Sequence, residues 1–208
     1  AITKTVTCEV IRLLPELGVT AVGESRVRDA LAKQRELGEA GASLAWHLVG
    51  HLQTNKAGKL LPFRFLHSLD SLRLLEAVEQ AWSGPAPLSV LVEVNVSGEA
   101  SKYGMPPGEV PALLAACASC RRVVVSGLMT MAPYADDPET SRPVFRALRE
   151  LRDDLARRLP AFPLPELSMG MTGDFEVAIE EGATVVRVGT ALFEGLPACL
   201  YWKKRTAP

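Results

Sequence analysis

A lysine near the start of the chain has surroundings that suggest covalent chemistry. Lys4 stands among Ile2, Thr3, Thr5 and Val6, with no charged neighbour on either side. Such surroundings are expected to lower the pKa of a lysine by desolvation and to favour the neutral amine, which is a Schiff-base nucleophile. The same position also suits an ordinary lysine that reaches to solvent. Which interpretation holds depends on the residues that lie near Lys4.

Two glycine-bearing stretches near the other end of the chain indicate an anion site. "SMG" (168–170) and "RVGT" (187–190) each place a hydroxyl beside glycine N–H groups. Glycine lets the backbone approach a ligand closely, and N–H groups at the start of a helix attract phosphate. One such stretch could simply end a strand and cap a helix near Asp174. Two neighbouring stretches of the same chemistry favour a phosphate site.

An arginine in the second stretch completes the set. Arg187 lies two residues before Gly189, so both residues face the same side of a strand, toward the interior. A buried guanidinium needs an acceptor, which could be Glu93 or Glu24 in a salt bridge, or a heteroaromatic nitrogen. A nucleophilic lysine, a phosphate site and an inward arginine match the aldehyde, the phosphate and the ring nitrogen of pyridoxal 5′-phosphate (PLP).

The elements that must position these residues alternate along the whole chain. Eight apolar or β-branched runs are each followed by a helical pattern, and they cover residues 1–3, 20–23, 46–50, 65–69, 88–95, 123–130, 166–169 and 184–190. This alternation predicts a single (β/α)8 TIM barrel over residues 1–208, with a tail at 196–208. An open doubly wound sheet is less favoured, since no G-x-G-x-x-G turn follows the first run. A barrel gathers the carboxyl ends of its strands, and with them the candidate residues, at one mouth.

Composition limits the choice of partners and compartment. The chain has 23 basic and 24 acidic residues, a net charge of −1, which does not supply the basic field that nucleic acid or an anionic membrane requires. No apolar run approaches the ~20 residues of a membrane-spanning helix, so we expect a soluble protein. Four cysteines without regular spacing favour a reducing cytoplasm. "CASC" (117–120), and His47 with His51, lack the further ligands of a metal site, so we expect none.

Several motifs resemble those of a known family. "AITKT", "VGES", "WHLVGHLQTNKAGKLL", "HSLDS", "VNVSGEASKYGM", "GLMTMAP" and "LSMGMTGDFEVAIEEGATVVRVGTALFEG" are similar to the successive motifs of the YggS-like pyridoxal phosphate homeostasis proteins. The resemblance runs from residue 1 to about residue 195. It implies a barrel of the alanine racemase N-terminal-domain type, with PLP as its cofactor. Such proteins usually begin with a further helix, so we expect that a leading segment is absent from this numbering.

The resemblance also assigns roles to individual residues. It implies an aldimine between PLP and Lys4, and it implies the following cofactor contacts: Ser168, Gly189 and Thr190 at the phosphate, Arg187 near the pyridine nitrogen, Asn95 and Met129 beside the ring, and His67 nearby. The family usually reads G-E-N where this chain reads Gly23, Glu24 and Ser25, so we expect the contact made by that asparagine to be lost or mediated by water.

Binding is favoured over catalysis. An arginine at the ring nitrogen disfavours a pyridinium, and none of Tyr103, Tyr134 and Tyr201 has a clear claim to act as a second base. We therefore predict a non-enzymatic, monomeric carrier that holds PLP for intracellular vitamin B6 homeostasis, with PLP-dependent apo-enzymes as possible partners. The alternatives are a small PLP-dependent amino-acid racemase or decarboxylase, and a Schiff-base phosphosugar aldolase that uses Lys4.

Overall fold

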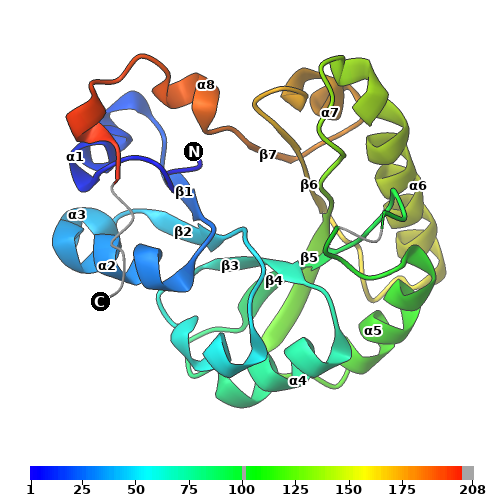
Figure 1. The fold of residues 1–208 in the computed structure, drawn as a ribbon. Coiled ribbons are helices and arrows are strands. Elements are labelled where there is room, and N and C mark those ends of the chain that lie inside the picture. The colour runs from blue at the N-terminus through cyan, green and yellow to red at the C-terminus, as the bar shows by residue number, and fades with distance from the viewer. Residues whose placement is uncertain (100–101, 203–208) are drawn as a thin grey trace.

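Seven parallel strands follow one another around the sheet in sequence order. A computed structural model describes residues 1–99 and 102–202. The strands are β1 (Ala21–Glu24), β2 (Ala45–Leu48), β3 (Phe65–Leu69), β4 (Leu88–Glu93), β5 (Val123–Met129), β6 (Glu166–Met171) and β7 (Val185–Arg187). Figure 1 shows them as a nearly closed ring with the helices outside. The predicted barrel is confirmed, with seven regular strands where eight were expected.

The helices lie on the outer side of this ring. The α-helices are α1 (Cys8–Leu13), α2 (Val27–Leu37), α3 (Glu39–Ala42), α4 (Leu72–Ala81), α5 (Val110–Cys117), α6 (Arg142–Arg158), α7 (Phe175–Glu180) and α8 (Thr190–Phe193). The 3₁₀ helices are η1 (Pro15–Leu17), η2 (Thr54–Lys59), η3 (Pro107–Glu109), η4 (Pro138–Ser141) and η5 (Ala198–Leu200). In the described part of the chain, no helix is long and apolar enough to cross a membrane.

The expected first strand is present in its place but not as a regular strand. Residues 1–3 lie beside β1, where Ile2 forms a parallel bridge with Gly23 and the Thr3 N–H donates to the Gly23 carbonyl at 3.0 Å. On the other side, the Ile2 N–H donates to the Val188 carbonyl at 2.8 Å. The segment therefore fills the eighth position of the barrel, with a few hydrogen bonds to β1 and one, from Ile2 to Val188, on its other side.

Sequence patterns explain where the helices begin and end. Ser71 caps α4, since its hydroxyl accepts a hydrogen bond from the Leu74 N–H. The helix that begins at Val27 ends before Gly38, whose φ of +58° is disfavoured for other residues. In α6, Phe145, Leu148 and Leu155 recur at helical spacing and are buried, so this face packs inward and its arginines stay outside.

One strand boundary differs in a way that matters for the site. The strand was expected to end at residue 169, but β6 continues to Met171 and includes Gly170 at φ +89°. A Cβ on Gly170 would lie 2.5 Å from the Ala178 Cβ, so this glycine allows α7 to pack closely against the strand. The extension places Ser168 inside the wall of the barrel and moves the loop to residues 172–174.

Candidate functional site

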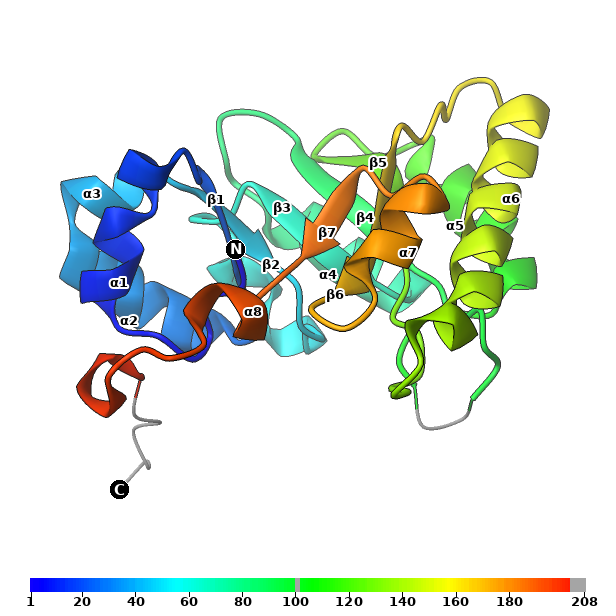
Figure 2. The same cartoon turned by 90° about the horizontal axis from the view of Figure 1, so that it is seen from above.

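A cavity of about 1020 Å³ opens at the end of the barrel where loops follow the strands. Figure 2 shows α8 and the loop after β6 at this same end. The cavity is lined by four of the eight predicted site residues: Lys4, Arg187, Gly189 and Thr190. Ser25, which stands at the departure from the family motif, lines it as well. Among the described residues, the other four predicted site residues lie outside this lining.

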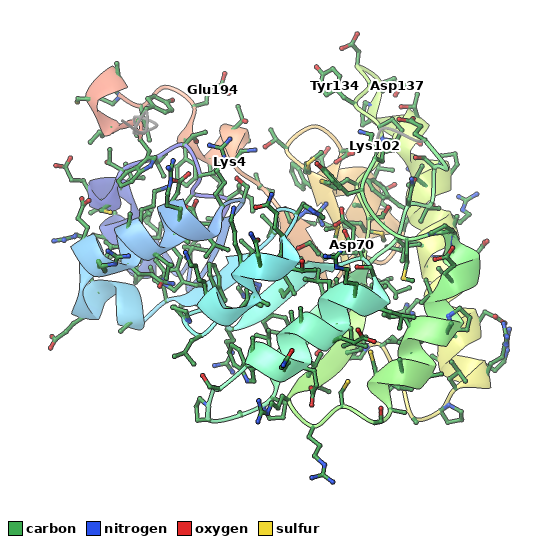
Figure 3. The ribbon with its side chains drawn as sticks, turned by 60° about the horizontal axis from the view of Figure 1, so that its bottom comes forward. Lys4, Asp70, Lys102, Tyr134, Asp137 and Glu194 are labelled. Carbon is green, nitrogen blue, oxygen red and sulfur yellow. The ribbon has the colours of Figure 1, made fainter. Side chains whose placement is uncertain are left out.

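Lys4 stands at the rim of the cavity. Its side chain is exposed, so the buried apolar environment expected from the sequence is wrong. Figure 3 shows Lys4 on one side of the open mouth, with Lys102 and Tyr134 across from it. The Lys4 amine thus borders the cavity and is accessible to a ligand that enters it.

A buried ion pair holds the segment that carries Lys4. The Lys33 Nζ lies 2.9 Å from the Glu24 Oε1, and the two side chains are 0% and 1% exposed. Lys33 also donates to the carbonyl of Thr3 at 2.6 Å, and the Thr3 hydroxyl donates to the Glu24 Oε1 at 2.7 Å. Two of these three buried contacts involve Thr3 and so fix the residue directly before Lys4. Glu24 was a candidate partner of Arg187, but its partner is Lys33.

Arg187 lies inside the barrel and binds neutral groups. Its Nη1 donates to the Ser168 hydroxyl at 2.7 Å and its Nη2 donates to the Thr130 carbonyl at 2.8 Å. Neither of the salt bridges considered from the sequence forms in the described structure, since no carboxylate lies within 4 Å of the guanidinium. Burial lowers the pKa of Arg187 to about 10, while Glu93 and Asp174 oppose that shift, so the side chain stays charged at neutral pH. Its Nε has no partner among the described residues and is available to a ligand.

Two histidines continue this hydrogen-bonded chain. The Ser168 Oγ lies 3.0 Å from the His67 Nδ1, and the His67 Nε2 lies 2.9 Å from the His47 Nδ1. Because Arg187 can only donate, Ser168 accepts from it and its own proton is left for His67 Nδ1. Burial lowers the pKa of His67 well below its usual range and that of His47 to about 4, so both rings are neutral at pH 7. Hydrogen bonds then run in one direction, from Arg187 to His47.

Removing the middle of this chain is expected to destabilise the barrel. Ser168→Ala leaves the Arg187 Nη1 and the His67 Nδ1 without a partner in the interior, which costs about 1–3 kcal/mol in the free energy of unfolding. Urea unfolding measures this loss. Ser119→Ala is the matched control, since its exposed hydroxyl binds only the Ala116 carbonyl. A loss below about 0.5 kcal/mol for Ser168→Ala would contradict this account.

A carboxyl group in the barrel is buried without full hydrogen bonding. Glu93 is 2% exposed, and its Oε2 has no hydrogen-bond partner in the described part of the chain. Burial, with a smaller effect of Asp70, raises the pKa of Glu93 from 4.5 to about 7, while Arg187 opposes the shift. The folded state therefore holds a proton here that an unfolded chain would release.

Stability is expected to depend on pH through Glu93. Because its pKa is raised on folding, the stabilisation is complete below pH 4.5 and is lost as the pH rises through about 7. Glu93→Gln removes this titration. Relative to wild type, the free energy of unfolding of the variant should therefore be about 3 kcal/mol higher above pH 8 than at pH 4.5. Urea unfolding across this range, with exposed Glu76→Gln as control, tests it. An equal difference at both ends of the range would show that Glu93 does not titrate as described.

The end of the cavity that was predicted to bind phosphate contains a residue that sequence reasoning missed. Thr172 and Gly173 line the cavity in the loop after β6, next to Gly189 and Thr190 after β7. The Thr172 Oγ1 lies 3.4 Å from the Gly189 N and 3.5 Å from the Ala191 N. These contacts are long and weak, so the N–H groups and the hydroxyl can donate hydrogen bonds to an anion instead. The signal in the sequence was the "TG" pair between a strand and a helix.

Three of the four predicted residues outside the cavity lining, Ser168, Met129 and Asn95, have other surroundings in the structure. Ser168 is fully buried and its hydroxyl binds Arg187 and His67, so it reaches the cavity only through Arg187. Met129 is also fully buried, and Met131 lines the cavity in its vicinity. The Asn95 side chain accepts from the Gly98 N–H and donates to the Glu99 carbonyl within its own loop. Their contacts with a cofactor remain predictions.

Other lysines besides Lys4, and further polar groups, lie in or near the cavity. Lys56 lines the cavity, whereas Lys102 lies outside its lining in the part of the chain that the structure describes; Lys203 and Lys204 fall outside that part. The His51 Nδ1 lies 3.1 Å from the Asp70 Oδ2. The His51 ring stacks on the ring of Tyr103, with their centroids 4.5 Å apart. The described residues form no group of three or more metal-ligating side chains, and their four cysteines are free thiols.

Fold and site together define the class of this protein. It is a parallel barrel whose mouth combines an accessible lysine, an inward arginine and two adjoining loops rich in N–H and hydroxyl groups. Residues 4–197 match the family model of the alanine racemase N-terminal domain, which confirms the type of barrel predicted.

Relatives narrow this class to one family. The chain is 46% identical over 192 residues to the pyridoxal phosphate homeostasis protein of Aquifex aeolicus, over 91% of this chain and 83% of the relative. It is 40% identical over 195 residues to the protein of the same name from Pseudomonas aeruginosa, over 93% and 82% of the two chains. PipY of Synechococcus elongatus PCC7942, solved without PLP and with PLP bound, has a TM-score of 0.85 and 35% identity over 93% of this chain and 90% of PipY. The chain belongs to the family of pyridoxal phosphate homeostasis proteins.

Proposed function

We propose that this protein binds PLP in the cavity at the barrel mouth and serves in PLP homeostasis, with Lys4 as the covalent anchor. The observation that carries the proposal is that Lys4, Arg187 and the Gly189–Thr190 turn line one cavity although they lie at opposite ends of the chain. A PLP-bound structure of the relative PipY supports it.

The residues present fit the cofactor. The Lys4 amine is accessible for attachment to the aldehyde, and the loops at Thr172 and Gly189 offer a hydroxyl and N–H groups to the phosphate. The Arg187 Nε is a donor suited to the ring nitrogen. When bound, PLP supplies an aldehyde that attaches reversibly to amines and a ring that can draw electrons from them. Residues 1–208 would serve as one cofactor-binding domain.

The geometry supports holding PLP more strongly than using it in turnover. Arg187 is charged and anchored by two hydrogen bonds, so it disfavours a proton on a ring nitrogen placed beside it and weakens electron withdrawal by the ring. The relatives carry the name of homeostasis proteins. A carrier that releases its ligand intact needs an anchor and a pocket but no second proton-transfer group.

The direct test is to trap the cofactor on the protein. We expect PLP-treated protein, freed of unbound ligand, to show a visible absorption band and to carry one PLP on Lys4 after borohydride reduction and peptide mapping by mass spectrometry. A reduced adduct spread over Lys56, Lys102 and other lysines, or no band, would overturn the proposal and favour the phosphosugar aldolase.

One observation favours the alternative function of an amino-acid racemase. Tyr103 and Tyr134 line the same cavity as Lys4, so two phenol groups stand at the mouth. They are 58% and 88% exposed, and within the described residues no hydrogen bond fixes either hydroxyl at a reacting position. Incubation of the PLP-loaded protein with L-alanine, followed by chiral chromatography, distinguishes the two functions. We expect no D-alanine above the rate given by free PLP.

We further propose that the protein acts as a monomer in the cytoplasm and passes PLP to apo-enzymes that require it. A nearly closed ring of strands leaves little free sheet edge for association, which supports the monomer. Light scattering of the purified protein measures the oligomeric state, and transfer to an apo-enzyme is measured by the return of that enzyme's activity.

A further inference from the structure

The charged residues of the cavity are all of one sign. Those that line it in the described structure are Lys4, Arg26, Arg28, Arg35, Lys56, Lys59 and Arg187, and no aspartate or glutamate is among them. The chain as a whole has 23 basic and 24 acidic residues. The rest of the chain therefore carries 16 basic and 24 acidic residues. The mouth is a local positive region on an otherwise acidic protein.

Five of these cations are more than the proposed cofactor site requires. That site uses Lys4, Arg187 and the loops after β6 and β7, whereas the other five come from α2, its N-cap residue and η2. We call these five residues, Arg26, Arg28, Arg35, Lys56 and Lys59, the basic groove. All five are exposed, and their only salt bridge within the described residues joins Arg28 to the adjacent Asp29 at 3.6 Å.

The basic groove has an elongated, amphipathic form. Arg28, Leu31 and Arg35 lie at spacings of three and four residues on one face of α2, a stripe about 10 Å long. Lys56 and Lys59 are three residues apart in the 3₁₀ helix η2, so they project from the same side of it. Among these cations the cavity wall is apolar, formed by Val27, Leu31 and Leu52.

This arrangement favours a short acidic chain over other anions. An exposed cation contributes little to binding by itself, so a small anion that meets one or two of them binds weakly, whereas an extended ligand engages several. The apolar wall rewards a ligand that also carries apolar side chains. A long nucleic acid would run beyond the groove, and the rest of the chain, with 16 basic and 24 acidic residues, has no excess of cations to bind it.

We propose that the basic groove docks an acidic, partly apolar segment of a partner protein across the mouth of the cofactor site. The cavity is continuous from the basic groove to Lys4 and Gly189, so a segment held there covers the route by which a ligand enters or leaves. The effect of docking on PLP release rests on the proposed function, but the docking itself does not.

The test uses a fluorescein-labelled short peptide in which glutamate alternates with leucine, and fluorescence anisotropy with the full-length protein. We expect binding that weakens as salt is raised, and at least a tenfold higher Kd for the variant Arg28→Gln/Arg35→Gln/Lys59→Gln. The control variant Arg64→Gln/Arg73→Gln/Arg121→Gln removes the same charge from exposed positions outside the cavity and should bind as wild type does. Circular dichroism confirms that both variants fold.

Other outcomes overturn the proposal. Equal loss of affinity in the two variants would show that only net charge matters. Tripolyphosphate or an oligothymidylate that binds the groove more tightly than the peptide would assign the basic groove to a phosphate polyanion or to single-stranded nucleic acid.

Lys4→Ala protein should bind the peptide as wild type does. Loss of the PLP adduct with intact peptide binding, or the reverse, therefore separates a failure of the cofactor proposal from a failure of docking.

Discussion

Lys4→Ala protein is expected to hold no covalently attached PLP. Lys4 lines the cavity together with Arg187 and Gly189, and the substitution removes its amine while leaving the exposed rim otherwise intact. After treatment with PLP and borohydride, the wild-type chain should gain the mass of one reduced adduct and the variant none. The visible absorption band should be lost in parallel, which spectrophotometry on matched samples measures.

Two controls make this result specific to Lys4. Lys56→Ala removes another exposed amine of the same cavity and should leave the Lys4 adduct unchanged. Lys4→Arg keeps the positive charge without a nucleophilic amine, so it should retain some reversible affinity for PLP without an adduct. A full adduct in Lys4→Ala would show that the covalent anchor lies elsewhere.

Lys33→Met is expected to cause the largest loss of stability. The Lys33 ammonium is 0% exposed and lies 2.9 Å from the Glu24 carboxylate, so its removal leaves an unpaired charge inside the protein. Breaking a buried ion pair from one side costs about 3–5 kcal/mol in the free energy of unfolding. Urea unfolding at pH 7 measures the loss. Because Lys33 also binds the Thr3 carbonyl, the variant should hold less PLP at equal total ligand.

The double variant Lys33→Met/Glu24→Leu separates charge from packing. Removing both charges should recover most of the loss, since well-packed apolar residues often replace a buried pair without cost. Lys59→Met, at an exposed position, should change the free energy of unfolding by less than about 0.5 kcal/mol. A loss below about 1 kcal/mol for Lys33→Met would contradict the view that Lys33 is needed as the buried partner of Glu24.

The fold was predictable because its signal is repeated along the chain. Each strand and helix pair carries the same alternation of patterns, so an error at one boundary does not change the architecture. The boundary of β6 shows the limit of this approach. Gly170 was interpreted as the end of a strand, but it lies inside one, and the consequence is that Ser168 lies in the wall of the barrel, where its hydroxyl accepts from Arg187.

The ion pair of Lys33 was missed for a different reason. Its helix has a polar appearance, and a lysine in such a helix is usually solvated. Lys33 follows Ala30 by three residues and precedes Leu37 by four, so it lies on the one face of α2 that is buried. That spacing was available in the sequence, but its partners Glu24 and Thr3 come from other elements, and only the assembled barrel brings them within reach.

The eighth position of the barrel has a consequence for how the molecule fluctuates. On the side of β7, residues 1–3 are held by a single backbone hydrogen bond, from the Ile2 N–H to the carbonyl of Val188, which directly follows β7 and precedes Gly189. This seam is the least reinforced join between neighbouring positions of the ring, so its amide protons should exchange with solvent through local opening before those of β4 and β5. A ligand attached to Lys4 and held by Gly189 spans the seam. Slower deuterium uptake at Ile2 and Thr3 would then report the occupancy of the pocket without any chromophore.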